Sequence, residues 1–272
     1  MIYKKEEITK SFFENVSFSF LKRNLPMIIS VSGENYPEFI KDFQKPYDPI
    51  FISAMQKTLL RLCERIPGCV FGYTEAFDLT LVIMPPANIE STSWYSLDTQ
   101  RIVSLTAGIT AMEFNRIFEK SAKSYVLGGN NFDETKKINA MQGYVNAIDK
   151  GAVFSAKCFN LSPDEIYKYI YARQKESIGI SVKAAARTFF KENELVGKSS
   201  SDIQFMIFDK AGINFDDYPA AFKHGSACLK NYSIDGSLFS EIHPENAWVI
   251  DKEMPMLRDD NKEYVNRLLT PA

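Results

Sequence analysis

The chain has 272 residues, 45% of them hydrophobic and 24% charged, as is ordinary for a soluble globular protein. Its 32 basic and 34 acidic side chains give a net charge of −2, which excludes a chain-wide basic field for nucleic acid, so RNA binding would need a local patch. No apolar run reaches membrane-spanning length and the start MIYKKEEITK lacks a signal-peptide core, so we expect a cytoplasmic protein without membrane contact.

The first 84 residues are predicted to contain three strands and a helix. Met27–Ser32 is short, apolar and β-branched, and Gly33 follows it, as for a buried central strand. Asp48–Ile66 carries apolar residues at helical spacing. Cys69–Tyr73 and Phe77–Met84 are predicted as two strands around a tight turn. The odd-numbered residues of the last strand are apolar, so they should face the core.

The next segments complete a predicted fold. Leu97–Lys120 is predicted as a long helix and Phe154–Leu161 as a further strand. Between them, Ser121–Lys150 is polar and contains GGNNFDETKK, which predicts a mobile surface excursion. The order β-α-β-β-α-β is that of a ferredoxin-like polymerase palm, and the fold class is therefore predicted as α+β.

The second half is predicted to be mainly helical. Ser162-Pro163-Asp164-Glu165 is a capping box and starts a helix to about Gln174, and a second helix is predicted over Val182–Glu192. Another capping box, Ser201–Gln204, should open a helix that Gly212 closes. The predicted division is a palm core at 1–161, a C-terminal helical extension at 162–230 and a polar tail at 231–272. The tail holds an apolar cluster around Trp248, for docking on the core or for a partner.

The four cysteines form no CxxC pair, and the two histidines, His224 and His243, lie far from the first three of them. We therefore expect no zinc site and expect the cysteines to be reduced, buried thiols.

Several short motifs follow one another from about Leu25 to Lys230, and none of them is decisive alone. They are Ser30–Tyr36, the set Phe43, Lys45, Pro46 and Asp48, Phe71–Ala76, Arg101–Ser104, Phe154–Lys157, Arg173-Gln174 with Glu176, and Gly212–Asp217 with Pro219, Phe222 and Gly225. In the order of these motifs the chain resembles the tRNA-His guanylyltransferase family, whose members are palm-type enzymes that add nucleotides in the 3′–5′ direction.

The resemblance implies a two-metal Mg²⁺ site built from carboxylates, and here most of them are missing. Ser32 stands in place of the family's first aspartate, and Ala76 in place of a glutamate. Glu75 remains as a candidate catalytic and metal-binding carboxylate, with Ser32 as a weak metal ligand. Asp78, a second candidate catalytic residue, and Glu34 are the acids nearest to these positions. Either the site is rebuilt with them, or they are ordinary loop acids.

Other departures also indicate a degenerate site. Ser155 removes the aspartate of the third motif, and Lys157 replaces an arginine and loses its bidentate fork. Residues 178–181 (IGIS) stand where the family has a polar helix rich in histidine and asparagine.

Nucleotide binding needs fewer residues than catalysis, and the candidates for it are retained. The amides of Gly33–Tyr36 are predicted to donate to phosphate, and Phe71, Tyr73 and Phe77 are candidates for stacking a base or for core packing. For RNA, Lys183, Arg187 and Lys191 fall at i, i+4, i+8 spacing, which is either a binding stripe or a solvated face. The candidate nucleotide-binding residues are Gly33, Glu34, Asn35, Tyr36, Lys45, Asp48, Arg101 and Lys157.

Three functions are compatible with these residues. The leading interpretation is a family member that binds a nucleotide, an oligonucleotide or tRNA, with GTP or ATP as candidate ligands, and whose catalysis is impaired or lost. The alternatives are an active Mg²⁺-dependent enzyme acting on the 5′ end of tRNA, and a palm-fold scaffold for a protein partner. The resemblance also implies a homo-oligomer.

Overall fold

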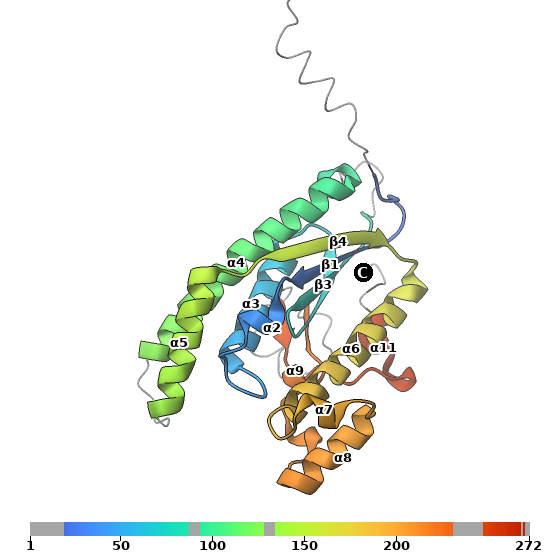
Figure 1. Cartoon of the computed structure of the whole chain (residues 1–272). Helices are drawn as coiled ribbons and strands as arrows, with labels where there is room; N and C mark the ends of the chain where they lie inside the picture. The colour runs from blue at the N-terminus through green and yellow to red at the C-terminus, as the bar shows by residue number, and fades with distance from the viewer. Residues whose placement is uncertain (1–18, 87–92, 128–133, 231–246, 268, 270–272) are drawn as a thin grey trace, which may run out of the picture.

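The computed structural model describes residues 19–86, 93–127, 134–230, 247–267 and 269. Within them, six strands form one antiparallel sheet in the order β4-β1-β3-β2-β5-β6 (Figure 1). The strands are β1 (Met27–Gly33), β2 (Cys69–Glu75), β3 (Asp78–Ile83), β4 (Phe154–Asn160), β5 (Ser226–Lys230) and β6 (Trp248–Asp251). The first four strands confirm the predicted palm, and the C-terminal part adds β5 and β6 at one edge.

Helices cover both faces of the sheet. The longer ones are α3 (Pro49–Arg65), α4 (Thr99–Leu127), α5 (Glu134–Lys150), α6 (Pro163–Ala186) and α8 (Ser200–Ala211). The short helical segments are α2 (Tyr36–Phe39), η1 (Trp94–Leu97), α7 (Glu192–Leu195), η2 (Phe215–Asp217), α9 (Ala220–Lys223), η4 (Asp259–Asn261) and α11 (Glu263–Asn266). Among the described residues, none of these helices is both long and apolar enough to cross a bilayer.

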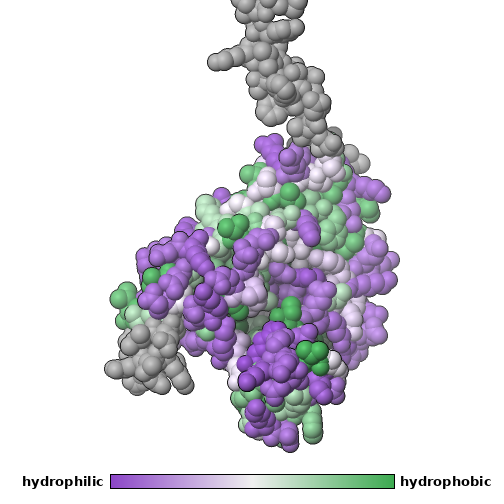
Figure 2. Space-filling model, in the orientation of Figure 1, coloured by the Kyte–Doolittle hydropathy of each residue, from purple (hydrophilic) through white to green (hydrophobic). Residues whose placement is uncertain are grey.

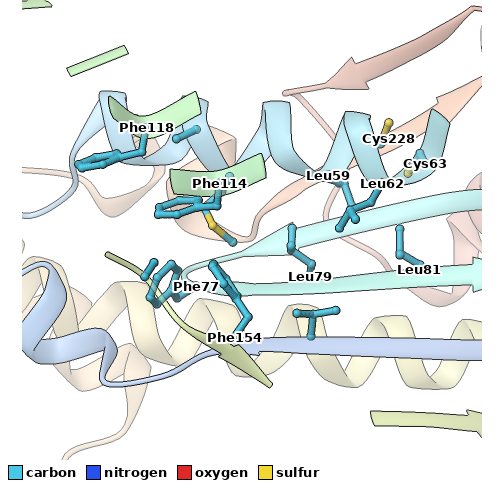
Figure 3. Close-up of a cluster of buried hydrophobic side chains, with 14 of the residues drawn as sticks. Leu59, Leu62, Cys63, Phe77, Leu79, Leu81, Phe114, Phe118, Phe154 and Cys228 are labelled. Atoms are coloured by element: carbon cyan, nitrogen blue, oxygen red, sulfur yellow. The ribbon is translucent and has the colours of Figure 1, made fainter. Parts of the chain in front are cut away.

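The alternation predicted for β3 places its two faces in two different cores. Leu79 and Leu81 belong to a cluster with Leu59 and Leu62 of α3, and Figure 3 shows these side chains facing one another. Val82 belongs to a second cluster, which includes Ile166 of α6. The sheet is therefore buried between α3 and α4 on one side and α6 on the other.

The core on the α3–α4 side is unusually aromatic. It holds seven phenylalanines, with neighbouring rings 5.0–6.4 Å apart: Phe39, Phe43, Phe51, Phe77, Phe114, Phe118 and Phe154. The ring of Phe77 lies over Gly33, where an added Cβ would come within 2.2 Å of it. Glycine is thus required at position 33 because of this close ring packing.

The predicted surface excursion over Ser121–Lys150 is wrong for its described residues. Helix α4 continues to Leu127, and α5 occupies Glu134–Lys150. Tyr144 and Ala147 are buried one helical turn apart, so α5 packs through a real apolar face despite its polar sequence. Residues 128–133, including the Gly-Gly-Asn-Asn run, lie outside the described part.

The C-terminal helices also differ from the prediction at their ends. Helix α6 starts at the predicted Ser162 capping box but runs without a break to Ala186. Within the continuous helix the Ser181 hydroxyl has two acceptors in reach, the oxygens of Ile178 and Lys223, and the second of these links α6 to the end of α9. Helix α8 is capped by Ser199 with Asp202, not by Ser201, and ends at Gly212 as predicted.

The predicted apolar cluster of the tail docks on the core. Trp248 begins β6, which pairs with β5. The chain then returns beneath α6, where Gln174 donates to the Pro255 oxygen and accepts from the Leu257 amide at 2.6 Å. The division of the chain at residues 161 and 230 stays a prediction.

Candidate functional site

The candidate catalytic residues meet at one end of the sheet. Asp78 of β3 is paired with Ser32 of β1 on one side and with Glu75 of β2 on the other. Ser32 and Glu75 therefore lie on strands separated by β3, two strand spacings or about 10 Å apart. Ala76, at φ 41°, forms the tight turn that brings Glu75 back to Asp78.

Arg173 of α6 holds these carboxylates together. Its Nη2 atom lies 2.7 Å from Oε1 of Glu75 and 2.5 Å from Oδ2 of Asp78, and its Nη1 lies 2.9 Å from Oε2 of Glu176. The Glu75 side chain is only 3% exposed, against 21% for Arg173 and 30% for Asp78. The contact with Glu75 is an ion pair without hydrogen-bond geometry, since Oε1 of Glu75 has no hydrogen-bond partner.

The electrostatics of Glu75 are dominated by its burial. Burial raises the pKa of Glu75 to about 8. The guanidinium of Arg173 opposes this rise, and the negative charge of Asp78 adds to it. Burial lowers the pKa of Arg173, but the neighbouring acids Glu75 and Asp78 together raise it above its usual value, and its charge is permanent. Arg173 therefore carries a fixed positive charge, and Glu75 takes up a proton near neutral pH.

The loop after β1 contributes less to anion binding than predicted. The Gly33 amide donates to the Phe77 oxygen at 2.9 Å, and the Glu34 amide donates to the Val153 oxygen at 2.8 Å. These two amides are therefore not free to bind phosphate. Asn35 is exposed in a left-handed conformation, φ 55°. The Tyr36 ring packs on Phe77, and burial raises its pKa to about 12.

Lys45 and Asp48 lie farther along the same connection between β1 and α3. The Lys45 ammonium donates to the Ile40 oxygen at 2.7 Å, and burial lowers its pKa. The Asp48 carboxylate caps α3 by accepting from the Ile50 and Phe51 amides, both at 2.9 Å. It also accepts from the Tyr144 hydroxyl at 2.7 Å and the Gln44 amide at 3.2 Å, so its oxygens are occupied by the fold.

Asp48→Ala is therefore expected to lower the free energy of unfolding by about 2–3 kcal/mol, because it removes a helix cap and leaves a buried hydroxyl unpaired. Denaturant titration measures this loss. Asp164→Ala, at an exposed acid in the first turn of α6, is the control and should change stability by less than about 1 kcal/mol. Equal stability of the two variants would contradict the capping role.

The remaining predicted residues are distributed over three places. Lys157 is exposed on β4 opposite Ser30, two residues from Ser155, which pairs with Ser32. Arg101 lies in the first turn of α4 over the Tyr95 ring, 4.8 Å from its centroid. The backbone oxygen of Thr99, close to Arg101 in the chain, accepts from the Cys158 thiol toward the end of β4. Gly33 pairs with Phe154 at the start of β4, so Arg101 and Gly33 lie at opposite ends of this strand.

The three aromatic candidates take the core-packing alternative, and the three basic candidates do not form one helical stripe. Lys183 lies in the last turn of α6, which ends at Ala186, whereas Lys191 is the N-cap residue of the separate helix α7. Arg187, between them, pairs with Glu192 at 2.8 Å. The three basic residues therefore do not share one helical face. The three aromatic candidates are core residues with exposures of 0–2%: Phe71, Tyr73 and Phe77.

The site geometry can be compared with known proteins. The sequence pattern of the family described as tRNAHis guanylyltransferase matches residues 6–162, more than half of the chain. The chain belongs to this family. A Dictyostelium discoideum protein named "Probable tRNA(His) guanylyltransferase" is 24% identical over 243 residues, covering 85% of this chain and 84% of that protein.

Solved structures of the family share the fold. Two are of a bacterial tRNA(His) guanylyltransferase (Thg1)-like protein, in complex with ATP (TM-score 0.76) and with GTP (TM-score 0.72), each 20% identical. They cover 97% and 98% of this chain and 99% of their own. The Saccharomyces cerevisiae enzyme has a TM-score of 0.62 at 14% identity, with 82% of this chain and 92% of the other covered.

The residues present do not fit the Mg²⁺ ions that the family implies. Within the described ranges, no three His, Cys, Asp or Glu side chains are grouped as metal ligands. One nitrogen of the Arg173 guanidinium, Nη2, already contacts both Glu75 and Asp78. Ser32 is neutral and Ala76 has no ligand atom. A hard divalent cation needs several anionic oxygens, and here Arg173 neutralises Asp78 while burial favours the protonated form of Glu75.

Sequence reasoning missed the role of Arg173. It noted the Arg173-Gln174 pair and Glu176 as matches to the family but gave Arg173 no partner. The i, i+3 spacing to Glu176 was a signal for one ion pair. The pairing with Glu75 and Asp78 depends on how α6 crosses the sheet, which no local pattern encodes.

Proposed function

We propose that this protein is a nucleotide- or RNA-binding member of the tRNAHis guanylyltransferase family whose 3′–5′ nucleotidyl transfer is impaired or lost. The observation that carries the proposal is the contact of the Arg173 guanidinium with both Glu75 and Asp78, at the place where the family implies a metal site. A fixed guanidinium supplies charge neutralisation without a vacant coordination position, and it cannot activate an attacking oxygen as a metal does.

Two residues of the connection between β1 and α3 are proposed to hold the nucleotide. Lys45 uses one of its three donors on the Ile40 oxygen and keeps the others for a phosphate. Asn35, which precedes α2 in the same connection, is exposed and offers a side-chain amide as a second donor. GTP and ATP are the candidate ligands, supported by the two bacterial family structures described in complex with ATP and GTP. tRNA is the candidate RNA, supported by the family to which the chain belongs.

Calorimetry with GTP and ATP tests the binding part of the proposal. We expect affinities that change by less than about 2-fold between Mg²⁺ and a chelator, because no metal bridges protein and phosphate. Lys45→Ala should weaken binding about 10-fold, the scale of one charge-assisted contact. Lys57→Ala, at an exposed lysine of α3, is the matched control and should leave affinity unchanged. No binding of either nucleotide would favour the scaffold.

Incorporation of labelled GTP into tRNA lacking its extra 5′ nucleotide tests the catalytic part. Wild type should give background incorporation, equal to that of Glu75→Ala. Robust incorporation that disappears in Glu75→Ala would identify an active enzyme instead. The cytoplasmic location and the homo-oligomer stay predictions from the sequence.

A further inference from the structure

A groove of about 840 Å³ runs between α6 and the C-terminal segment, where no predicted site residue lies. Figure 1 shows α11 beside α6, and the Tyr167 hydroxyl donates to the Arg258 oxygen at 2.8 Å across this contact. Tyr167, Tyr171 and Lys175 recur every four residues, so they share one face of α6 and line the groove. Arg173 lies two residues from Tyr171 and Lys175 and thus points to the opposite face, toward the sheet.

The groove is locally basic on a chain that is acidic overall. Four cations and two carboxylates line it: Lys168, Lys175, Arg258, Lys262, Asp164 and Asp259. Asp259 is paired with Lys262 at 2.9 Å. The other three cations are exposed and form no salt bridge with any described residue. This flank of the molecule is mostly hydrophilic in Figure 2. With four cations against two carboxylates, the lining has an excess of positive charge, which is complementary to a polyanion.

Two tyrosine rings lie among these cations. The rings of Tyr167 and Tyr171 are stacked with centroids 6.1 Å apart at 23°. Tyr167 is buried and fixed by its hydrogen bond to Arg258, whereas Tyr171 is only partly buried. The Lys175 ammonium lies 5.4 Å from the Tyr171 centroid, on a flexible stem that a planar ligand can displace. An aromatic ring flanked by unpaired cations is the arrangement that binds single-stranded nucleic acid.

We propose that this groove binds a single-stranded segment of RNA, with a base stacked on Tyr171 and phosphates on Lys168, Lys175 and Arg258. The inference deepens the proposed function and rests on it, because it takes RNA as the ligand and names the surface that holds it. The nucleotide site proposed at Lys45 lies on the connection between β1 and α3, so the two sites can be tested separately. An acidic peptide would use the same cations, but it has no base to stack.

Fluorescence anisotropy with a labelled single-stranded RNA of about ten nucleotides tests the cations. The double variant Lys168→Ala, Lys175→Ala should bind about 10-fold more weakly and lower the slope of log affinity against log salt by about 1.4, that of two phosphate contacts. Lys57→Ala with Lys198→Ala removes two exposed lysines elsewhere and should leave both quantities unchanged. Equal losses in the two double variants would overturn the site.

The tyrosine is tested in the same assay. Tyr171→Ala should weaken RNA binding about 10-fold through lost stacking, whereas Tyr171→Phe should keep it. An abasic oligonucleotide should bind wild type about 10-fold more weakly than the RNA. Equal binding of both oligonucleotides, or equal competition by a polyglutamate peptide, would overturn the RNA assignment.

Failure of the groove and failure of the proposed function give different results. Groove variants that lose RNA but retain GTP affinity by calorimetry support the site. RNA binding that the groove variants leave intact overturns the groove alone. Wild type that binds GTP but no RNA also overturns the groove, whereas wild type that binds neither ligand contradicts the proposed function itself.

Discussion

Arg173→Leu is expected to lower the free energy of unfolding by about 3 kcal/mol at about pH 9, the largest loss that we predict for one side chain. At that pH Glu75 is ionised, and the substitution leaves this buried carboxylate beside Asp78 without its cation. The loss should be smaller at about pH 6, where a proton neutralises Glu75 instead. Urea unfolding at both pH values measures the difference.

Arg187→Leu is the matched control, because Arg187 also pairs with a glutamate but both side chains are more than half exposed. An exposed pair contributes less than about 1 kcal/mol, and the control should therefore stay near wild type at both pH values. If Arg173→Leu were as stable as the control at about pH 9, the cluster would not hold the palm to α6.

The fold could be predicted from the sequence where local chemistry decides the structure. Alternation along β3 identified its two faces, and the Ser162 capping box located the start of α6. The polar segment now seen as α5 was misread because its burial depends on few positions, Tyr144 and Ala147 among them. Its polar residues satisfy the pattern of a loop equally well.

The candidate site was predictable only in part. The order of the motifs indicates a palm, and the strand pairing of a palm places Ser32, Glu75 and Asp78 at one end of the sheet. Of the two roles left open for Phe71, Tyr73 and Phe77, the structure shows core packing, the commoner use of aromatic residues in the middle of a sheet. The basic stripe was wrong because i, i+4 spacing has meaning only within one helix, and α6 ends at Ala186.

Glu75 should make the protein less stable as the pH rises from about 4.5 to about 8. An unfolded glutamate has a pKa near 4.5, whereas burial raises the pKa of folded Glu75 to about 8. Between these values the folded state holds a proton that the unfolded state has released. The contribution of Glu75 is therefore complete below about pH 4.5 and lost as the pH passes about 8, by at most about 1.4 kcal/mol per pH unit.

Glu75→Gln isolates this contribution, because glutamine keeps the shape of the protonated acid and cannot ionise. The difference in unfolding free energy between Glu75→Gln and wild type should grow by a few kcal/mol in favour of the variant from about pH 5 to about pH 8, and then stay constant. Other groups titrate in this range, including His224, whose pKa is lowered by burial, but they are present in both proteins and cancel in the difference. Parallel stability curves would mean that Arg173 keeps Glu75 ionised throughout, so that the cluster would be a permanent ion pair rather than a protonated one.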